Sequence, residues 1–506
     1  MSEGIKLPGS WLTVKVSDVG TSITGNTPST QHAENYGNLI PYIKPPQLID
    51  RPIESSKEFL SEQGGKLARV LPRFSILVSC IGNLGKTGLN KIPVAFNQQI
   101  NAIVPFKGIS SAYLFYQAQS HSFRSQLESK ATATTISIVN KGNFETVELS
   151  LAPLNEQHRI VTKIEELFSE LDKGIENLKT ARAQLKVYRQ ALLKHAFEGK
   201  LTAQWRAENQ GKLETADALL KRIQQERAQR YQQQLADWEA AGKQGSKPKA
   251  PKPLPPLTAE ELVALPELPE GWGWTRLGHS NVEVSDGPFG SNLKSSDYVD
   301  SGVRVVRLEN IGALKFIEEK ESYVTEEKYE LLKRHTVTSG DIVFSSFIIE
   351  NVRVALVPPS ITKAINKADC FCVRFSGETL SNVYAVLFLS TRHVYKQLES
   401  LIHGVGRPRI NTTQLKDVVA PVCGAAEQQV IIAEIESRLS EVDQLDQTIT
   451  TALQQAEALR QSILKKAFSG HLVPQDPHDE PASALLARIK VEREQSDKPK
   501  RGRKSA

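Results

Sequence analysis

The chain has 506 residues, a net charge of +6 and four cysteines, and 40% of its residues are hydrophobic. This length predicts three or four domain-sized units of a soluble protein. The weak positive charge permits a nucleic-acid partner without identifying one. The chain shows no basic start followed by an apolar run and no stretch near 18 apolar residues, so we expect no membrane segment, a cytoplasmic location and reduced thiols.

Two segments of the chain repeat one another. Residues 156–201 align without a gap on 427–472 and are identical at 19 of 46 positions, where unrelated sequences would match at roughly one position in twenty. Shorter pieces repeat in the same order: 7–11 matches 268–272, 151–153 matches 419–421, and 216–223 matches 482–489. The chain is therefore a tandem duplication of head, helix and spacer. The two heads, about 150 residues each, barely resemble one another, which suggests one assembly task and two different ligands.

In the first head, residues 74–80 and 99–104 are predicted strands that bracket a glycine-rich turn at 82–87. The turn is similar to a phosphate-binding loop, but that pattern needs a glycine where this chain has Cys80. We find no amino-methylation motif, no dinucleotide fingerprint, no zinc-protease motif and no serine nucleophile elbow. Catalysis by this chain alone is not expected. Cys370 and Cys372 alternate with Phe371, which is typical of one face of a strand and not of a metal site.

Both repeated segments are predicted helices with apolar residues spaced alternately by three and four. These spacings indicate a heptad seam. The seam positions are Ile160, Ile164, Leu167, Leu171, Gly174, Leu178, Ala181, Leu185, Tyr188 and Leu192 in the first helix, and Ile431, Ile435, Arg438, Val442, Leu445, Ile449, Ala452, Ala456, Leu459 and Ile463 in the second. Helices of about 45 residues would be roughly 65–70 Å long. The alternative is that each helix lies on its own globular core. The duplication favours a coiled coil, antiparallel if the two halves are related by a pseudo-twofold axis.

The connector between the halves is charged and rich in glutamine at 202–240, where apolar residues show helical spacing, and it continues as a Pro/Lys run at 247–256 that should be stiff and extended. The C-terminal basic run, 498–504, is expected to be a solvated tail, with non-specific attraction to phosphates as the alternative.

Several loops of the heads combine glycines with amide and cationic side chains. In the second head these are 286–294 and 404–411, and in the first head Asn97–Gln99 and Lys86 occupy comparable positions. Arg and Lys can donate to guanine, whereas Asn and Gln pair with adenine in the major groove. For each residue the alternative is a solvated turn. The candidate DNA-binding residues are Lys86, Gln98, Gln99, Asn292, Lys294, Arg407, Arg409 and Asn411, and we name no catalytic or metal-binding residue.

The chain resembles the DNA-specificity subunits of type I restriction–modification systems. The resemblance lies in the Leu-Pro-x-x-Trp opening of each half, residues 24–29, 287–291 and 407–411, and the Glu-Gln helix ending in Ala-Phe-x-Gly. It implies an α+β fold in which two long antiparallel coiled-coil helices join two mixed α/β target-recognition domains as a pseudo-twofold tandem duplication. The expected segments are recognition domain 1 (1–152), first spacer helix (153–203), charged and Pro/Lys-rich linker (204–266), recognition domain 2 (267–420), second spacer helix (421–473) and basic tail (474–506).

The resemblance also implies a function. Each head would recognise one half of a bipartite, asymmetric sequence in double-stranded DNA, and the helices would set the spacing and dock two methyltransferase (modification) subunits. No cofactor is expected in this chain: S-adenosylmethionine would be bound by those subunits, and ATP and Mg by restriction/translocase subunits. One alternative is a coiled-coil scaffold with protein-binding heads. A stand-alone endonuclease or methyltransferase is disfavoured by the missing motifs.

Overall fold

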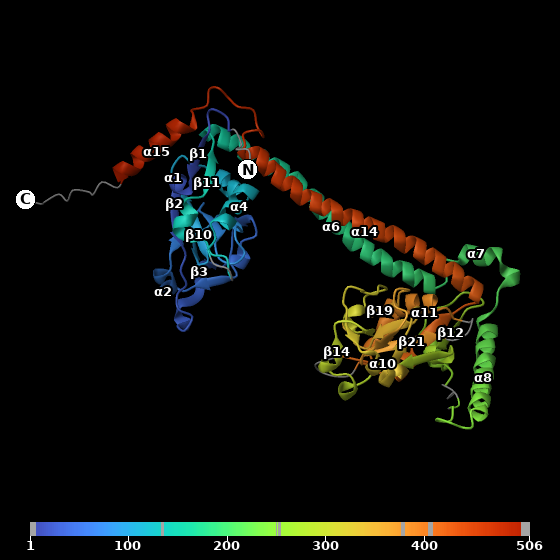
Figure 1. Ribbon diagram of the computed structural model, residues 1–506. Coiled ribbons are helices and arrows are strands. Elements are labelled where there is room, and N and C mark those ends of the chain that lie inside the picture. Colours follow the sequence, from blue (N-terminus) through green and yellow to red (C-terminus); the bar gives the residue numbers. More distant parts are fainter. Residues whose placement is uncertain are drawn as a thin grey trace, which may run out of the picture. The chain divides into compact units, whose positions relative to one another are not determined.

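The computed structural model describes residues 7–132, 136–248, 250, 255–375, 380–402 and 408–496. The chain forms two compact units. Unit 1 contains Met1–Thr180 together with Ile449–Ala506, and unit 2 contains Ala181–Thr448. Two 44-residue helices, α6 (Leu154–Phe197) and α14 (Ala425–Phe468), each have one end in unit 1 and the other in unit 2 (Figure 1).

Among its described residues, the head of unit 1 contains three sheets and several short helices. One sheet pairs β1 (Leu12–Lys15) with β11 (Glu148–Leu151). A five-stranded sheet has the order β2 (Gly20–Thr24), β10 (Ile100–Pro105), β7 (Ile76–Ser79), β8 (Thr87–Asn90), β4 (Arg51–Ile53). A four-stranded sheet has the order β5 (Glu58–Leu60), β3 (Tyr36–Ile43), β9 (Val94–Phe96), β6 (Val70–Leu71). The helices are α1 (Val16–Val19), α2 (Glu62–Leu67), α3 (Ser111–Ala118), α4 (His121–Ser129) and α5 (Lys141–Glu145). Strands β7 and β10 confirm the two strands predicted in this head.

The head of unit 2 is built in the same way. One sheet pairs β12 (Gly273–Arg276) with β22 (Val419–Val422). A four-stranded sheet has the order β13 (Val282–Ser285), β21 (Cys370–Phe375), β18 (Ile342–Ser345), β19 (Val354–Leu356). A five-stranded sheet has the order β14 (Tyr298–Val299), β16 (Tyr323–Val324), β15 (Val303–Val306), β20 (Ala364–Asn366), β17 (Thr336–Val337). The helices are α10 (Glu326–Leu332), α11 (Asn382–Leu389), α12 (Arg392–Glu399) and α13 (Thr412–Asp417).

The two heads share one topology although their sequences diverge. The order β2-β10-β7-β8 in the first head corresponds to β13-β21-β18-β19 in the second, and β5-β3-β9-β6 corresponds to β16-β15-β20-β17. The central pairs of the first sheets, β10 with β7 and β21 with β18, are both antiparallel. The predicted fold, two mixed α/β heads joined by two long helices, is therefore confirmed.

The long helices run antiparallel, because each unit pairs the start of one helix with the end of the other. In unit 1, Ile160 and Ile164 of α6 share a core with Leu464 and Phe468 of α14. In unit 2, Phe197 at the end of α6 shares a core with Ile431, Ile432 and Ile435 of α14. The aromatic contact at the end of each long helix is also repeated. Phe468 packs on Tyr113 and Phe197 packs on Tyr384, both with ring centroids 5.2 Å apart and planes at 74°.

The predicted heptad seam is only partly buried. Its outer positions Ile160, Ile164, Ile431 and Ile435 are buried, but Tyr188, Leu445 and Leu459 are 44%, 53% and 52% exposed, so the prediction was wrong at these three positions. Two helices alone form a narrow interface that cannot cover every seam residue. Ion pairs across the helices contribute instead. They join Arg182 to Asp446 at 2.8 Å and Arg189 to Asp443 in unit 2, and Arg460 to Asp172 in unit 1.

The short repeat that follows each long helix forms an amphipathic helix. After α7 (Ala203–Glu208), the linker contains α8 (Ala216–Ala240), in which Ala216, Leu219 and Ile223 enter the core of unit 2. The tail contains α15 (Ala482–Ser496), whose matching residues Ala482, Leu485 and Ile489 enter the core of unit 1. The linker also contains the short helix α9 (Ala259–Val263). Burial at matching positions explains why the Ala-x-Ala-Leu-Leu-x-Arg-Ile sequence occurs twice.

A tryptophan–glutamate hydrogen bond fastens each head to its helix. The indole Nε1 of Trp11 donates to Glu156 Oε2, and that of Trp272 donates to Glu427 Oε2, both at 2.9 Å. Both carboxylates are buried in the first turn of a long helix, where the helix dipole favours negative charge. This pairing accounts for the repeated Leu-Pro-x-x-Trp and Glu-Gln motifs.

The four cysteines are buried and unpaired. Cys370 and Cys372 belong to one core cluster and Phe371 to another, which confirms that they alternate along β21. Burial raises the pKa of the Cys80 and Cys372 thiols to about 12, so both are protonated and unreactive at neutral pH. Among the residues that the structure describes, no helix has the length and apolar character needed to cross a membrane.

Candidate nucleic-acid interface

Backbone hydrogen bonds identify equivalent positions in the two heads. The amide of Ser79, at the end of β7, donates to the carbonyl of Lys86 at 2.8 Å, and the amide of Ser345, at the end of β18, donates to that of Arg353 at 2.9 Å. The next residue on each strand also matches, because Cys80 N donates to Gln99 O at 2.8 Å and Ser346 N to Asp369 O at 2.9 Å. Lys86 therefore corresponds to Arg353, and Gln99 corresponds to Asp369.

A further loop reaches the same strand end in each head. Val139 N donates to Cys80 O at 2.8 Å, and Ile410 N donates to Ser346 O at 3.0 Å. The preceding residues form matching antiparallel bridges, Ile138 with Ile81 and Arg409 with Phe347. Ile138 of the first head thus occupies the position of Arg409 in the second.

Gly25 of residues 24–29 and Gly287 of residues 287–291 lie against the turns that contain Gln99 and Asp369, respectively. A Cβ on Gly25 would come within 2.2 Å of the Asn97 carbonyl oxygen, and one on Gly287 within 2.2 Å of the Lys367 carbonyl carbon. Only glycine permits this approach. Each head therefore brings four chain segments together at one end of its central sheet, and we call this convergence the loop face. It is defined by 25–27, 81–86, 97–99 and 136–140 in the first head, and by 286–287, 347–353, 367–369 and 408–411 in the second.

On the first loop face, two predicted residues lie side by side. Gln98 is exposed and its Oε1 accepts a hydrogen bond from Thr27 Oγ1. Gln99 is half-buried and its Oε1 accepts from Asn97 Nδ2 at 3.0 Å. These contacts orient the side-chain amides of Gln98 and Gln99 at the surface, because the Oε1 of each already accepts one hydrogen bond.

Lys86 has a different environment. Its Nζ lies 3.3 Å from Asp50 Oδ2, and Asp50 also accepts from the amide and hydroxyl of Thr87 and lies 3.8 Å from Arg124. Asp50, Lys86 and Arg124 line a cavity of about 930 Å³ between the first head and the long helices. Lys86 thus lies where its charge is already balanced by Asp50.

On the second loop face, Arg409 is 57% exposed and its NH1 lies 3.5 Å from Asp369 Oδ1, which also accepts from Ser346 Oγ at 3.1 Å. The amides of Gly287 and Asp369 donate to Asp286 Oδ1 at 2.7 and 2.9 Å. Burial raises the pKa of Asp286, against these amides, which lower it. Asp286 therefore ties the glycine loop to the turn that carries Asp369.

The other predicted residues of the second head have separate positions. Asn411 caps α13 by accepting from Gln414 N at 2.9 Å, as Asn140 caps α5 in the first head, so this asparagine has a structural role common to both heads. Asn292 ends a short 3₁₀ turn and Lys294 begins the next, both exposed. Arg407 lies outside the described residues. Sequence reasoning missed Asp369 and Ile138, because no local motif marks them and only the backbone equivalence reveals them.

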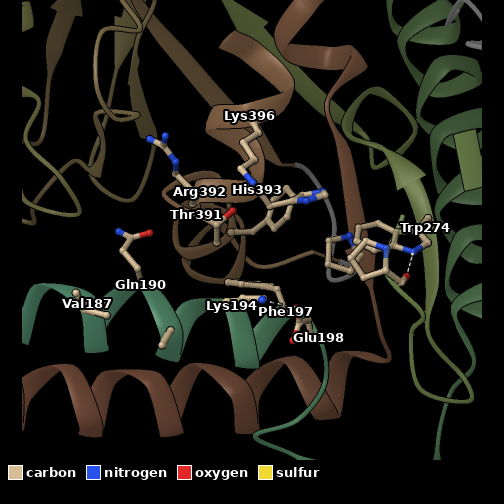
Figure 2. Close-up of a pocket in the computed structure, with 14 residues that line it drawn as sticks. Val187, Gln190, Lys194, Phe197, Glu198, Trp274, Thr391, Arg392, His393 and Lys396 are labelled. Atoms are coloured by element: carbon tan, nitrogen blue, oxygen red, sulfur yellow. Dashed lines mark hydrogen bonds and ion pairs between the residues drawn. The ribbon is translucent and has the colours of Figure 1, made fainter. Parts of the chain in front are cut away.

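A second cavity, of about 480 Å³, lies in unit 2 where the end of α6 meets the head. Phe197, Trp274 and Phe388 line its apolar part, and Gln190 and Lys194 of α6 face Arg392 and His393 across it (Figure 2). In unit 1 the repeat places Gln461 at the position of Gln190, where it bridges the head by accepting from His121 N at 3.0 Å.

The comparisons with known proteins agree with this architecture. Residues 8–180 match the family model described as the type I restriction modification DNA specificity domain. The chain is 23% identical to the EcoKI specificity subunit of Escherichia coli strain K12, with all of both chains covered. It is 24% identical to the StySPI specificity subunit of Salmonella potsdam, covering 99% of each.

One solved structure has a similar fold. It concerns complex assembly and conformational transition of the type I R-M system, and its chain is similar over 92% of this chain and 100% of that one, with a TM-score of 0.63 at 18% identity. Over its whole length the chain is therefore similar to type I restriction enzyme specificity subunits, and residues 8–180 match the model of their DNA specificity domain.

Proposed function

We propose that this chain is the sequence-specific DNA-binding subunit of a type I restriction–modification complex in the cytoplasm, with one half of a bipartite target recognised by each head. The observation that carries the proposal is the pair of loop faces: one backbone frame presents Gln99 and Ile138 in the first head, and Asp369 and Arg409 in the second. Different side chains at equivalent positions are what two readers of different half-sites require. The shared backbone arrangement of the two heads does not by itself require different side chains at these positions.

Exchanging one head should change one half of the target. If residues 12–150 are replaced by the equivalent region of a related subunit, the half-site read by the first head should change while the other half stays the same, because each loop face is built within its own head. Sequencing the methylated positions in host DNA with and without the exchanged gene measures both halves at once. Changes in both halves would show that the heads are not independent readers.

The alternative of a coiled-coil scaffold with protein-binding heads makes a different prediction for the same purified chain. A DNA reader loses affinity for duplex steeply as salt rises, because each neutralised phosphate releases counterions. A protein-binding scaffold would show no such salt-dependent duplex binding.

We further propose that the helix pair docks two methyltransferase subunits that carry S-adenosylmethionine, with restriction subunits adding ATP- and Mg-dependent activities. This rests on apolar side chains that the helix pair leaves exposed in unit 2, namely Val187 at 70%, Tyr188 at 44% and Leu445 at 53%. Val187 also lines the apolar cavity beside α6. Exposed apolar residues along a helix suit burial by further helices.

Polar substitution of this helix surface should weaken assembly without unfolding the chain. Val187→Ser together with Leu445→Ser should reduce binding of the methyltransferase subunits by about tenfold, since two interface side chains are truncated. The control is Val491→Ser, which changes a valine of α15 that is 52% exposed. Co-purification from the host measures the effect. Equal recovery with the double variant and the control would contradict this docking surface.

A further inference from the structure

The two loop faces differ in chemistry at equivalent positions. In the second head a guanidinium, Arg409, is held beside a carboxylate, Asp369. In the first head the corresponding positions carry Ile138 and Gln99, and Gln98 adds an exposed amide next to them. Ile136 and Ile138 are 55% and 36% exposed, which leaves apolar surface uncovered on the same loop face as the two amides.

The four base pairs present different groups in the major groove. Guanine offers two acceptors, N7 and O6, to an arginine, whereas adenine offers one acceptor and one donor, which suit a glutamine amide. Thymine alone adds a methyl group that favours apolar side chains. The Arg409 site therefore fits guanine, and the site of Ile138 and Gln98 fits an A·T pair.

The contacts around these side chains strengthen the assignment. The Asp369 carboxylate accepts a hydrogen bond from Ser346 Oγ at 3.1 Å, and its backbone N–H donates to Asp286 Oδ1 at 2.9 Å, so Asp369 can hold Arg409 in one direction. A guanidinium restrained in this way loses less entropy on binding a base. In the first head, Thr27 similarly fixes Gln98 through its Oε1.

We infer that the equivalent loops select the type of base pair: Arg409, positioned by Asp369, recognises a guanine in one half-site, and Ile138 with Gln98 recognises an A·T pair in the other through the thymine methyl and the adenine edge. This inference rests on the proposed function. It goes beyond it by assigning the base chemistry of each half-site to named side chains.

The test removes single atoms from the DNA. Duplexes are first selected from a randomised library with the chain and the subunits that co-purify with it from its host. Each guanine of the selected target is then replaced by 7-deazaguanine, which lacks the N7 acceptor, and each thymine by deoxyuridine, which lacks the methyl. We expect one 7-deazaguanine position in one half-site to weaken binding about tenfold. One deoxyuridine position in the other half-site should weaken it about fourfold, the value of one buried methyl group.

The variants identify the side chain responsible. Arg409→Ile should bind the 7-deazaguanine duplex as well as the unmodified one, and Ile138→Ala should become insensitive to deoxyuridine. Asp369→Asn, which keeps a residue that tolerates the positive φ of 70° at this position, should reduce the 7-deazaguanine effect although Arg409 is present. The matched control is Lys333→Ala, an exposed cation of the same head that pairs with Glu330 and should behave as wild type.

The outcomes separate the two levels of the argument. If no sequence is enriched from the library, the proposed function is wrong. If a bipartite target is enriched but Arg409→Ile and Ile138→Ala retain the full 7-deazaguanine and deoxyuridine effects, DNA recognition stands and this base assignment is overturned.

Discussion

Replacing Glu427 by glutamine is expected to destabilise unit 2 by roughly 3 kcal/mol, the typical cost of leaving one partner of a buried ion pair uncompensated. Glu427 is 3% exposed and accepts hydrogen bonds from Trp272 at 2.9 Å, Thr202 at 2.6 Å and the guanidinium of Arg206. The Arg206 side chain is 13% exposed and also lies over the Trp272 ring. Without the carboxylate, this buried cation loses its counter-charge.

Glu156→Gln is the matched control because the repeat places Glu156 at the same position of α6. Trp11 donates to Glu156 Oε2 at 2.9 Å and Gln475 donates to Oε1 at 2.5 Å, and both donors are neutral. The single oxygen of a glutamine keeps one of these two bonds, and the donor that loses its partner carries no charge. We expect this variant to cost about 1 kcal/mol, the value of one hydrogen bond between neutral groups. Urea unfolding, with hydrogen exchange of peptides from each unit, measures both effects. Equal destabilisation by the two variants would contradict the role of Arg206.

The difference in stability between wild type and the Glu156→Gln variant should also depend on pH. Burial raises the pKa of Glu156 above its ordinary value of 4.5. A raised carboxyl pKa means that the folded state binds the proton more tightly, so its contribution to stability is full below pH 4.5 and is lost as pH rises through the folded pKa. Glu156→Gln removes this loss, so the stability of the variant relative to wild type should improve across that pH window.

The sequence repeats predicted how the helices and heads are joined, because the repeated residues form the contacts between them. Trp11 and Trp272 are fixed by Glu156 and Glu427, and the Ala-Leu-Leu-Arg-Ile segments are buried in matching cores. A duplication constrains these positions in both copies. The helix pair and its antiparallel sense could therefore be predicted without any structure. The exposure of the seam leucines could not be predicted, because the heptad pattern does not show how many neighbouring helices will cover each apolar position.

The loop faces were harder to predict because they combine short segments that are distant in the chain. Asp369 follows no motif, and its relation to Arg409 depends on the strand end at Ser346. Gln98 and Gln99 were found from their residue type, and the structure places them together, whereas Lys86 points to Asp50. Asn411 matched the expected chemistry of base recognition, yet its side chain caps a helix. Their roles in DNA contact stay predictions.

Inserting one heptad into both long helices should lengthen the non-specific gap of the DNA target by about three base pairs. Seven helical residues add roughly 10.5 Å, and B-DNA rises about 3.4 Å per base pair. The insertion belongs between Asp172 and Arg182 of α6 and between Asp446 and Arg460 of α14, because this choice preserves the cross-helix ion pairs of each unit. A full heptad also keeps the seam on the same face.

Both half-sites should stay unchanged, since neither loop face is touched, and methylated-site sequencing of the host reports the gap and both half-sites together. The control is a heptad inserted into α6 alone, which breaks the register between the helices and should lower the unfolding midpoint. Altered half-site bases with the original gap in the double insertion would show that the helices do not set the spacing. A longer gap with intact half-sites would show that the duplicated helices set the distance between the half-sites, whereas the divergent loops recognise their bases.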